Sequence, residues 1–305
     1  MTQPKDRVPF GRLLTAMVTP FTPGGELDLD GAQRLAAHLV DVERNDGLVI
    51  SGTTGESPTT SDEEKDRLLR AVVEAVGDRA AVVAGVGTND TAHTVHLAQA
   101  AEKAGATGTL VVTPYYNRPP QAGLLAHFRA VADATGLPSM LYDIPARTGA
   151  EIATETLLRL AEHPRIVAVK DAKDSLPAAA VVLARTDLAY YSGTDALNLP
   201  LLSVGATGFV SVVAHVVGAR LRELLDAWAA GDTARARAVN AGLLDVYQGI
   251  FRTQGVILTK AALRLAGLPG GPVRPPLVDA TDEQVETLRA DLAAAGVTLP
   301  ADGAA

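Results

Sequence analysis

Short runs rich in β-branched and other apolar residues alternate eight times with amphipathic helical patterns along this chain. The predicted strands are 14–19, 47–51, 81–86, 108–113, 139–144, 166–170, 189–192 and 208–213. The helical patterns that follow them are 30–44, 61–76, 90–104, 121–135, 153–162, 175–184, 196–204 and 216–230. Strands separated by helices pair in parallel. Eight such units favour a closed (β/α)8 TIM barrel over an open doubly wound sheet, and no glycine-rich dinucleotide turn follows the first strand.

The strand pattern stops near residue 231. Helical patterns continue at 232–252, 254–266 and 282–295, and a proline- and glycine-rich loop at 268–276 joins the last two. We therefore predict an α/β chain with a barrel at 1–230 and a C-terminal helical extension at 231–305, both in one structural unit. The tail at 300–305 is predicted to be disordered.

Composition argues against several classes of partner. The net charge is −8, the isoelectric point is about 5.3, and basic residues form no long run, so neither nucleic acid nor an anionic membrane surface is expected. The chain has no cysteine and only six histidines, none spaced as a metal-binding pair, so we expect no metal. The N-terminus lacks a signal-like apolar stretch and no apolar run approaches about 20 residues, so we expect a cytoplasmic protein.

Lys170 is the strongest candidate for a catalytic residue in this pattern. It ends the run Ile166-Val167-Ala168-Val169, which is typical of a strand buried on both faces. Burial disfavours an ammonium ion, and a neutral amine can attack a carbonyl group to form a Schiff base. The alternative is a lysine that reaches water at the strand end or pairs with Asp171. The residues that follow the other strands favour the first interpretation.

The active site of a β/α barrel lies at the C-terminal ends of its strands. After the second strand comes the turn Gly52-Thr53-Thr54-Gly55-Glu56-Ser57, whose glycines let backbone N–H groups face a carboxylate. The hydroxyl groups of Thr53 and Thr54 add donors and a path for protons. An ordinary polar turn that caps a helix has the same composition, so this motif alone is weak evidence.

Tyrosines and one arginine follow the fourth and fifth strands. Tyr115 and Tyr116 come after the fourth strand, and Tyr142 and Arg147 lie at the end of the fifth. A tyrosine at a barrel mouth can relay protons, and an arginine can hold a carboxylate through two hydrogen bonds. The alternatives are aromatic packing at the rim or at a subunit interface for the tyrosines and a surface salt bridge for Arg147.

The last two strands bring small residues to the same end of the barrel. Gly193 follows the seventh strand and Val210 lies in the eighth, where the backbone can approach a small ligand. The whole set suits a class I aldol-type reaction on an α-keto acid. The lysine condenses with the ketone, the turn binds its carboxylate, and the resulting enamine attacks an aldehyde whose own carboxylate pairs with the arginine. This chemistry requires neither a metal nor a phosphate site.

These motifs resemble those of the dihydrodipicolinate synthase family, within the pyruvate-dependent Schiff-base lyases that include N-acetylneuraminate lyase. They occur in the order and spacing of the family, and the resemblance runs from about residue 12 to about residue 296. The motifs are Gly52-Thr53-Thr54-Gly55-Glu56-Ser57, Thr113-Pro114-Tyr115-Tyr116-Asn117-Arg118-Pro119, Tyr142-Asp143-Ile144-Pro145-Ala146-Arg147-Thr148-Gly149 and Val169-Lys170-Asp171-Ala172.

The resemblance implies an activity and a role for each candidate residue. The activity is condensation of pyruvate with L-aspartate 4-semialdehyde to 4-hydroxy-tetrahydrodipicolinate, the first committed step of lysine and diaminopimelate biosynthesis. No cofactor is implied, because the substrate pyruvate itself is bound covalently to the lysine. It also implies a homotetramer built as a dimer of dimers. The implied catalytic residues are Lys170 as the Schiff-base lysine, Tyr142 as the proton donor and acceptor, Thr53, and Tyr116 from a neighbouring subunit. The implied substrate-binding residues are Thr54, Val210 and Gly193 for pyruvate and Arg147 for the semialdehyde.

Departures from the family pattern are small. Asp143 stands where many members have asparagine, and Thr194 stands where an acidic residue is common. The nearest alternative is another lyase of the same fold, such as N-acetylneuraminate lyase or a keto-deoxy-sugar aldolase, which would not need Arg147. A non-catalytic sensor of keto acids is a more remote alternative, and it would be expected to lack the lysine or the tyrosine.

Feedback inhibition by free lysine is predicted to be weak or absent. In inhibited members of the family, a glutamate and two histidines lie near the lysine ligand, next to the tyrosine that corresponds to Tyr115. Motif spacing places His93 at the glutamate position and Asp62 and Lys65 at the histidine positions. A cation at Lys65 repels the ammonium groups of the ligand.

Overall fold

Eight parallel strands close into a barrel in the computed structural model, which describes residues 8–297 and 299. Each strand pairs with the next, and β1 completes the ring by pairing with β8, where Leu14 lies opposite Val210. The predicted TIM barrel is therefore confirmed. Its strands are β1 (Leu13–Ala16), β2 (Gly47–Ile50), β3 (Ala81–Gly85), β4 (Gly108–Val112), β5 (Ser139–Asp143), β6 (Ile166–Asp171), β7 (Ala189–Ser192) and β8 (Gly208–Ser211).

Several predicted strands extend one to three residues too far at the C-terminal end. The prediction for the first strand ran to Thr19, whereas β1 ends at Ala16. Met17 and Val18 are buried, and Met17 N still donates to Val49 O (3.0 Å), but Val18 N donates to His215 Nε2 (3.1 Å) and not to a neighbouring strand. Apolar character therefore continues past the last residue of the strand, and it misplaces the boundary.

Alternate residues of each strand face opposite sides of the barrel wall. Met140, Tyr142 and Ala168 belong to the apolar cluster inside the barrel. Leu141 and Val169 belong to the cluster between the barrel and the surrounding helices. Both faces of the strands are thus buried, as their continuous apolar runs predict.

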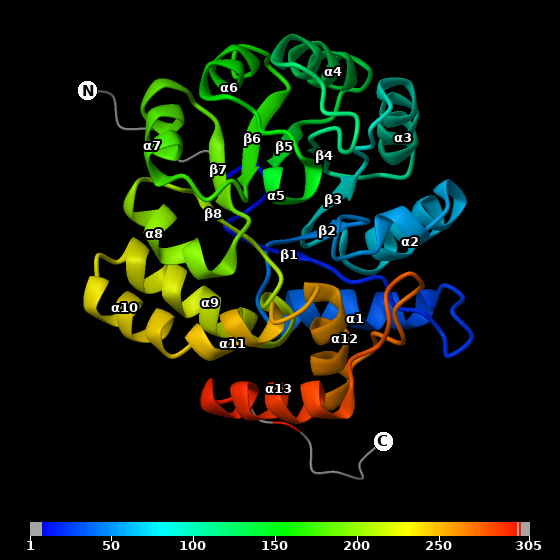
Figure 1. Cartoon of the computed structure of the whole chain (residues 1–305), viewed down its shortest axis with the longest axis vertical. Helices are drawn as coiled ribbons and strands as arrows, with labels where there is room; N and C mark the ends of the chain where they lie inside the picture. The colour runs from blue at the N-terminus through cyan, green and yellow to red at the C-terminus, as the bar shows by residue number, and fades with distance from the viewer. Residues whose placement is uncertain (1–7, 298, 300–305) are drawn as a thin grey trace.

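A ring of helices covers the outside of the barrel (Figure 1). Capping residues define several of the helix starts; in α2, Ser61 accepts a hydrogen bond from Glu64 N (3.1 Å) and Glu64 accepts one from Ser61 N (2.9 Å). The helices of the ring are α1 (Leu29–Asp41), α2 (Asp62–Val76), α3 (Thr91–Lys103), α4 (Gln121–Asp133), α6 (Thr154–Leu160), α7 (Leu176–Arg185), α8 (Asn198–Ser203) and α9 (Ala214–Ala229). Three short turns of helix lie at the barrel mouth, namely η1 (Ser57–Thr59), α5 (Pro145–Thr148) and η2 (Asp195–Leu197).

Four helices follow the barrel and lie together on one side of it (Figure 1). They are α10 (Thr233–Ala241), α11 (Leu244–Ile250), α12 (Gly255–Leu265) and α13 (Asp282–Ala294). The prediction of one continuous helix at 232–252 is wrong. Gly242 ends α10, and the ψ angles of Gly242 and Leu243 lie near 0°, so the chain changes direction before α11 and Leu243 packs into the core. The tail predicted to be disordered, 300–305, lies outside the described residues.

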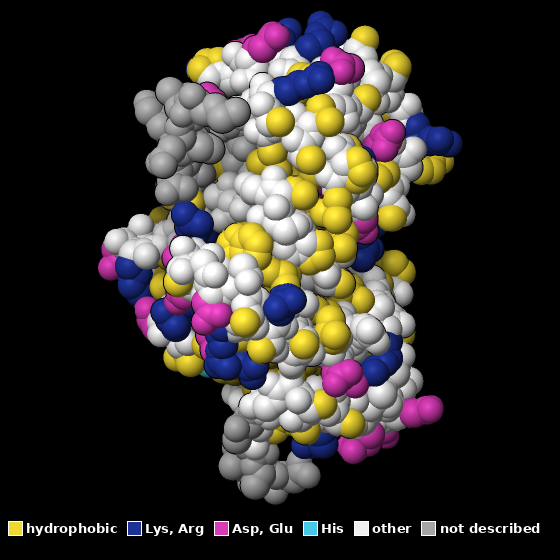
Figure 2. Space-filling view, turned by 90° about the vertical axis from the view of Figure 1, so that its left-hand side faces the viewer, with side chains coloured by type: hydrophobic (Ala, Val, Ile, Leu, Met, Phe, Trp, Pro, Cys, Tyr) yellow, Lys and Arg dark blue, Asp and Glu magenta, His cyan; other side chains and the backbone are white. Residues whose placement is uncertain are grey.

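Charged side chains of both signs are mixed on the face of the molecule formed by α7, α8 and α10 (Figure 2). Neither sign dominates there, which agrees with the argument from net charge against a polyanionic partner. Within the described part of the chain, no helix combines the length and the apolar character needed to cross a bilayer.

Candidate active site

Lys170 and Tyr142 lie side by side inside the C-terminal end of the barrel. The register of β5 and β6 places the two residues directly opposite each other. The Nζ atom of Lys170 lies 4.2 Å from the centre of the Tyr142 ring, and the Lys170 residue is only 4% exposed. The structure therefore excludes the alternative of a lysine that extends into water.

Burial changes the acidity of both groups. Desolvation lowers the pKa of Lys170 to about 8; the carboxylate of Asp195 opposes this shift and the guanidinium of Arg147 adds to it. Desolvation raises the pKa of Tyr142 to about 12, against the effects of Arg147 and of a side-chain hydrogen bond with Thr53. At pH 8 about half of the Lys170 side chains are therefore uncharged amines, whereas Tyr142 keeps its proton. The site thus holds a neutral nucleophile next to a proton donor.

Gly193 leaves the space that the Lys170 side chain occupies. A Cβ atom at Gly193 would lie 3.0 Å from Lys170 Cγ and 3.1 Å from Lys170 Cε, closer than packed atoms normally approach. The Gly193 N–H donates to the carbonyl of Asp171 (2.7 Å) and so holds the end of β7 against the end of β6. The glycine therefore determines how close the chain after β7 can come to the lysine.

The turn after β2 carries Thr53 and Thr54. Its backbone is fixed from two sides: Glu56 N donates to Thr53 O (3.2 Å), and Thr19 Oγ1 donates to Gly55 O (2.6 Å). Thr54 is buried, whereas Thr53 is partly exposed at the barrel mouth. The hydrogen bond between Thr53 and Tyr142 places the predicted hydroxyl group next to the predicted tyrosine.

Val210 belongs to the same inner apolar cluster as Tyr142. It is fully buried in β8, and its neighbour Ser211 donates from Oγ to the carboxylate of Asp195 (2.5 Å). Contacts thus join four of the predicted residues at the end of the barrel, namely Lys170, Tyr142, Thr53 and Gly193, while Val210 lies in the neighbouring β8.

Asp195 is a buried carboxylate to which the sequence analysis gave no role. Besides the bond from Ser211, it accepts hydrogen bonds from the backbone N–H groups of Val212 (3.0 Å) and Val213 (3.1 Å) and from Asn198 Nδ2 (3.2 Å). Its charge raises the pKa of Lys170 against the effect of burial, so it is a candidate to stabilise a cationic adduct on that lysine. An acidic residue two positions after the glycine of the β7 loop was the signal in the sequence.

Arg147 is exposed on the short helix α5, at the mouth of the barrel. Among the described residues it makes no ion pair, which argues against the alternative of a surface salt bridge. Its charge lowers the pKa of both Lys170 and Tyr142. A free guanidinium at this position is suited to bind the carboxylate of an incoming substrate.

Tyr116 does not join the site of its own chain. It is 89% exposed and has a left-handed φ of +72°, and its N–H donates to Thr148 O (3.3 Å). A non-glycine residue in this conformation stores strain that the surrounding structure must balance. The loop therefore presents the Tyr116 ring to the outside of the chain.

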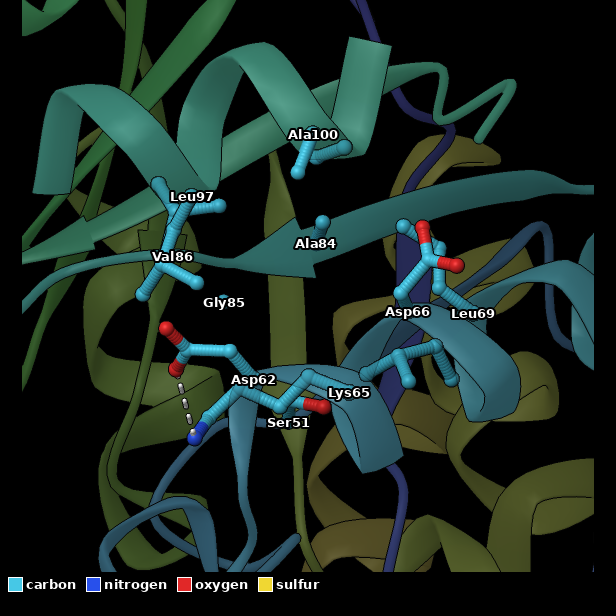
Figure 3. A pocket seen from close by; sticks show the side chains of 12 residues that line it. Ser51, Asp62, Lys65, Asp66, Leu69, Ala84, Gly85, Val86, Leu97 and Ala100 are labelled. Atoms are coloured by element: carbon cyan, nitrogen blue, oxygen red, sulfur yellow. Dashed lines mark ion pairs between the residues drawn. The ribbon is translucent and has the colours of Figure 1, made fainter. Parts of the chain in front are cut away.

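A narrow crevice lies between α2 and α3, outside the barrel mouth (Figure 3). Its free volume is about 30 Å³, enough for water but not for a substrate. Asp62 at its edge pairs with Lys65 (3.9 Å) and with His93 Nε2 (2.8 Å). The side chains predicted to replace the lysine-binding residues are therefore engaged with one another.

The fold, with a buried lysine at the carboxyl end of β6, is that of a TIM-barrel lyase. The chain belongs to the dihydrodipicolinate synthetase family, whose model matches residues 9–295. Within the part of the chain that the structure describes, no three His, Cys, Asp or Glu side chains gather as a metal site would require. Enzymes of this family need no external cofactor.

Relatives of high sequence identity match this chain over all or nearly all of its length. The 4-hydroxy-tetrahydrodipicolinate synthase of Acidothermus cellulolyticus is 70% identical over 100% of this chain and 98% of its own length. The 4-hydroxy-tetrahydrodipicolinate synthase 2 of Streptomyces coelicolor is 67% identical over 96% of this chain and 98% of its own. Among solved structures, dihydrodipicolinate synthase from Cyanidioschyzon merolae, determined with lysine bound, has a TM-score of 0.93 and 43% identity over 95% of this chain and 99% of its own.

These comparisons confirm the predicted family, fold and enzyme class. They also confirm the predicted activity, that of a 4-hydroxy-tetrahydrodipicolinate synthase in lysine and diaminopimelate biosynthesis. The roles of individual residues rest on the geometry above.

Proposed function

We propose that the chain condenses pyruvate with L-aspartate 4-semialdehyde through a Schiff base on Lys170. The neutral amine attacks the ketone carbon of pyruvate, and loss of water gives a protonated imine. Removal of a proton from the methyl group converts the imine to an enamine. The enamine carbon then attacks the aldehyde of the second substrate, which forms the new carbon–carbon bond.

One observation carries this proposal. Lys170 is buried, its pKa is lowered to about 8, and its Nζ atom lies 4.2 Å from the ring centre of a tyrosine that remains protonated. A buried lysine with only a structural role would need a partner for its charge. Among the described residues, Lys170 makes no hydrogen bond or ion pair, so its amine is available for reaction.

Each neighbouring residue has a role in this scheme. Tyr142 donates and accepts the protons of imine formation, and Thr53 relays them. The backbone at Thr54, Gly193 and Val210 shapes the pyruvate site. Arg147 holds the carboxylate of aspartate semialdehyde, because its charge acts on both Lys170 and Tyr142 and it makes no ion pair among the described residues.

The proposal includes a homotetramer, built as a dimer of dimers, in the cytoplasm. The contact between subunits is supported by Tyr116, whose ring is presented away from its own chain. In a dimer this ring can enter the relay of the partner. Mixing an inactive Tyr116→Phe variant with an inactive Lys170→Ala variant tests this, because hybrids contain one site with both groups intact. Recovery of activity is expected, and verified hybrids without activity would place Tyr116 outside the partner's site.

A panel of aldehydes tests the choice of second substrate. With pyruvate held constant, turnover is expected with aspartate semialdehyde and not with N-acetylmannosamine or glyceraldehyde. The neutral sugars lack the carboxylate that Arg147 is proposed to bind. Preference for either sugar would favour a lyase of the N-acetylneuraminate or keto-deoxy-sugar type instead.

A further inference from the structure

A buried ion pair joins the C-terminal extension to the turn that carries Thr53. Lys260, on α12, is 1% exposed, and its Nζ atom lies 2.6 Å from Oε1 of Glu56, which is equally buried. Glu56 follows Thr53 by three residues and is bonded to it through the backbone. The two charged residues are 204 positions apart in the chain, so this contact exists only because the extension packs against the barrel.

Glu56 sits in a backbone conformation that must be held in place. Its φ angle is +54°, in the left-handed region that disfavours residues with a side chain. Oε1 pairs with Lys260, while Oε2 accepts a hydrogen bond from Arg274 N (2.8 Å). Both carboxylate oxygens are thus anchored to the extension.

The segment that contains Arg274 closes around the same turn. Arg274 donates to Thr59 O (2.8 Å) and to Gly25 O (2.8 Å), and its guanidinium forms a two-point ion pair with Glu64 at the start of α2. Lys260 in turn donates to Pro272 O (2.7 Å). In Figure 1 the segment after α12 runs up beside α1 and α2, where these contacts form.

An aromatic ring completes the anchor. The Nζ atom of Lys260 lies 4.3 Å from the ring centre of Phe21, and the Arg274 guanidinium lies 4.1 Å from it. Phe21 belongs to the chain after β1, and its N–H donates to Gly270 O (3.4 Å). The extension therefore contacts the loops after both β1 and β2 with buried polar groups, and water does not screen them.

We infer that Glu56, with Lys260 as its counterion, is a positioning residue that holds the Thr53–Thr54 turn in register with Tyr142 and the pyruvate site. This inference rests on the proposed function and adds a role for the C-terminal extension in it. The part of the extension that contacts the turn then acts on the site indirectly, because it determines where the hydroxyl of Thr53 and the backbone of Thr54 lie. A displacement of about 1 Å in such a group can cost about 100-fold in rate.

The test compares Glu56→Gln and Lys260→Met with Arg252→Gln. Arg252 forms a two-point ion pair with Asp291 inside the extension, and within the described residues its hydrogen bonds do not reach the turn, so it is the control for loss of an ion pair elsewhere in the extension. Glu56→Gln keeps the shape of the side chain and removes its charge. We expect kcat to fall about 10- to 100-fold and KM for pyruvate to rise in Glu56→Gln and Lys260→Met. In Arg252→Gln the melting temperature is expected to fall with kcat and KM unchanged.

A conservative variant keeps the test decisive even if Glu56→Gln does not fold. Lys260→Arg retains the cation, so it is expected to keep more of kcat than Lys260→Met when both are measured well below their melting temperatures. If Glu56→Gln and Lys260→Met both lower only the melting temperature, the pair is structural and the inference is wrong. The proposed function is tested separately by borohydride trapping in the wild type. Failure to trap pyruvate on Lys170 would overturn that function.

Discussion

The side chains of Tyr142 and Lys170 face each other across two neighbouring strands of the barrel, with Nζ 4.2 Å from the ring centre. Both residues point inward because side chains alternate along a strand, and Met140 and Ala168, two positions before Tyr142 and Lys170, also face the barrel interior. Burial shifts their pKa values apart, so that the amine loses its proton more easily and the phenol holds its proton more firmly. A division of this kind between base and acid is what imine formation requires.

The rate of pyruvate capture is expected to rise with pH and to reach half of its maximum near pH 8. The attacking species is the neutral amine, which is depleted below the pKa of Lys170 and fully formed above it. The measurement is the initial rate of borohydride-trapped adduct between pH 6 and about pH 10. A midpoint near 10.5, the ordinary lysine value, would show that burial does not activate this amine.

Tyr142→Phe is expected to lower kcat by about 10²- to 10⁴-fold, the usual contribution of a general acid–base group. The ring and its packing remain, so the melting temperature is expected to change little. Tyr191→Phe serves as a control, because Tyr191 also faces the barrel interior but donates to Gly11 O (2.8 Å), away from Lys170 Nζ and the turn. Equal loss of activity in both variants would point to barrel packing rather than proton transfer.

Arg147→Ala is expected to weaken the use of aspartate semialdehyde far more than capture of pyruvate. Loss of a charge-assisted hydrogen bond costs about 1.5–3 kcal/mol, or about 10- to 150-fold in kcat/KM. Since Arg147 also lowers the pKa of Lys170, the pH midpoint of pyruvate capture is expected to move upward in this variant. Equal damage to both substrates, with no shift of the midpoint, would indicate a structural role.

Free lysine is expected to inhibit weakly, with half-inhibition above about 1 mM, a binding free energy weaker than about −4 kcal/mol. At the positions that the family resemblance assigns to lysine binding, Asp62 pairs with His93 and Lys65, so its charge is already partly balanced. The measurement is turnover at a series of lysine concentrations, and His93→Glu is expected to increase sensitivity. Strong inhibition of the wild type below about 1 mM would contradict this interpretation of Asp62, Lys65 and His93.

The sequence predicts the barrel well because its signal is local. Eight apolar runs, each followed by a helical pattern and some by a capping residue such as Ser61, require only neighbouring residues to be recognised. The places where prediction fails depend on distant contacts: the break at Gly242, where the chain turns so that Leu243 packs into the core, and the ends of strands whose apolar character continues past the ladder.

The same distinction holds for the site. Lys170, Tyr142 and Thr53 were found because each ends or follows a strand, and the barrel brings strand ends together. Glu56 and Lys260 form their buried contact across more than two-thirds of the chain, and no local pattern joins them. The ion pair could not be predicted without the folded chain, and for Asp195 the sequence indicates only an acidic residue after the seventh strand, not the hydrogen bonds that hold it.

The most direct test of the account is the site of covalent capture. Incubation with pyruvate and borohydride, followed by peptide mass spectrometry, is expected to place a reduced pyruvyl group on Lys170 and nowhere else. Lys260 is an internal comparison, because it is also buried with a lowered pKa but is held by Glu56 and Pro272. Lys173, bonded to Ile152 O (3.0 Å), is a second. Labelling of Lys170, and its loss in Lys170→Ala together with turnover, is the predicted result; labelling of Lys173 or Lys260 instead would contradict the mechanism.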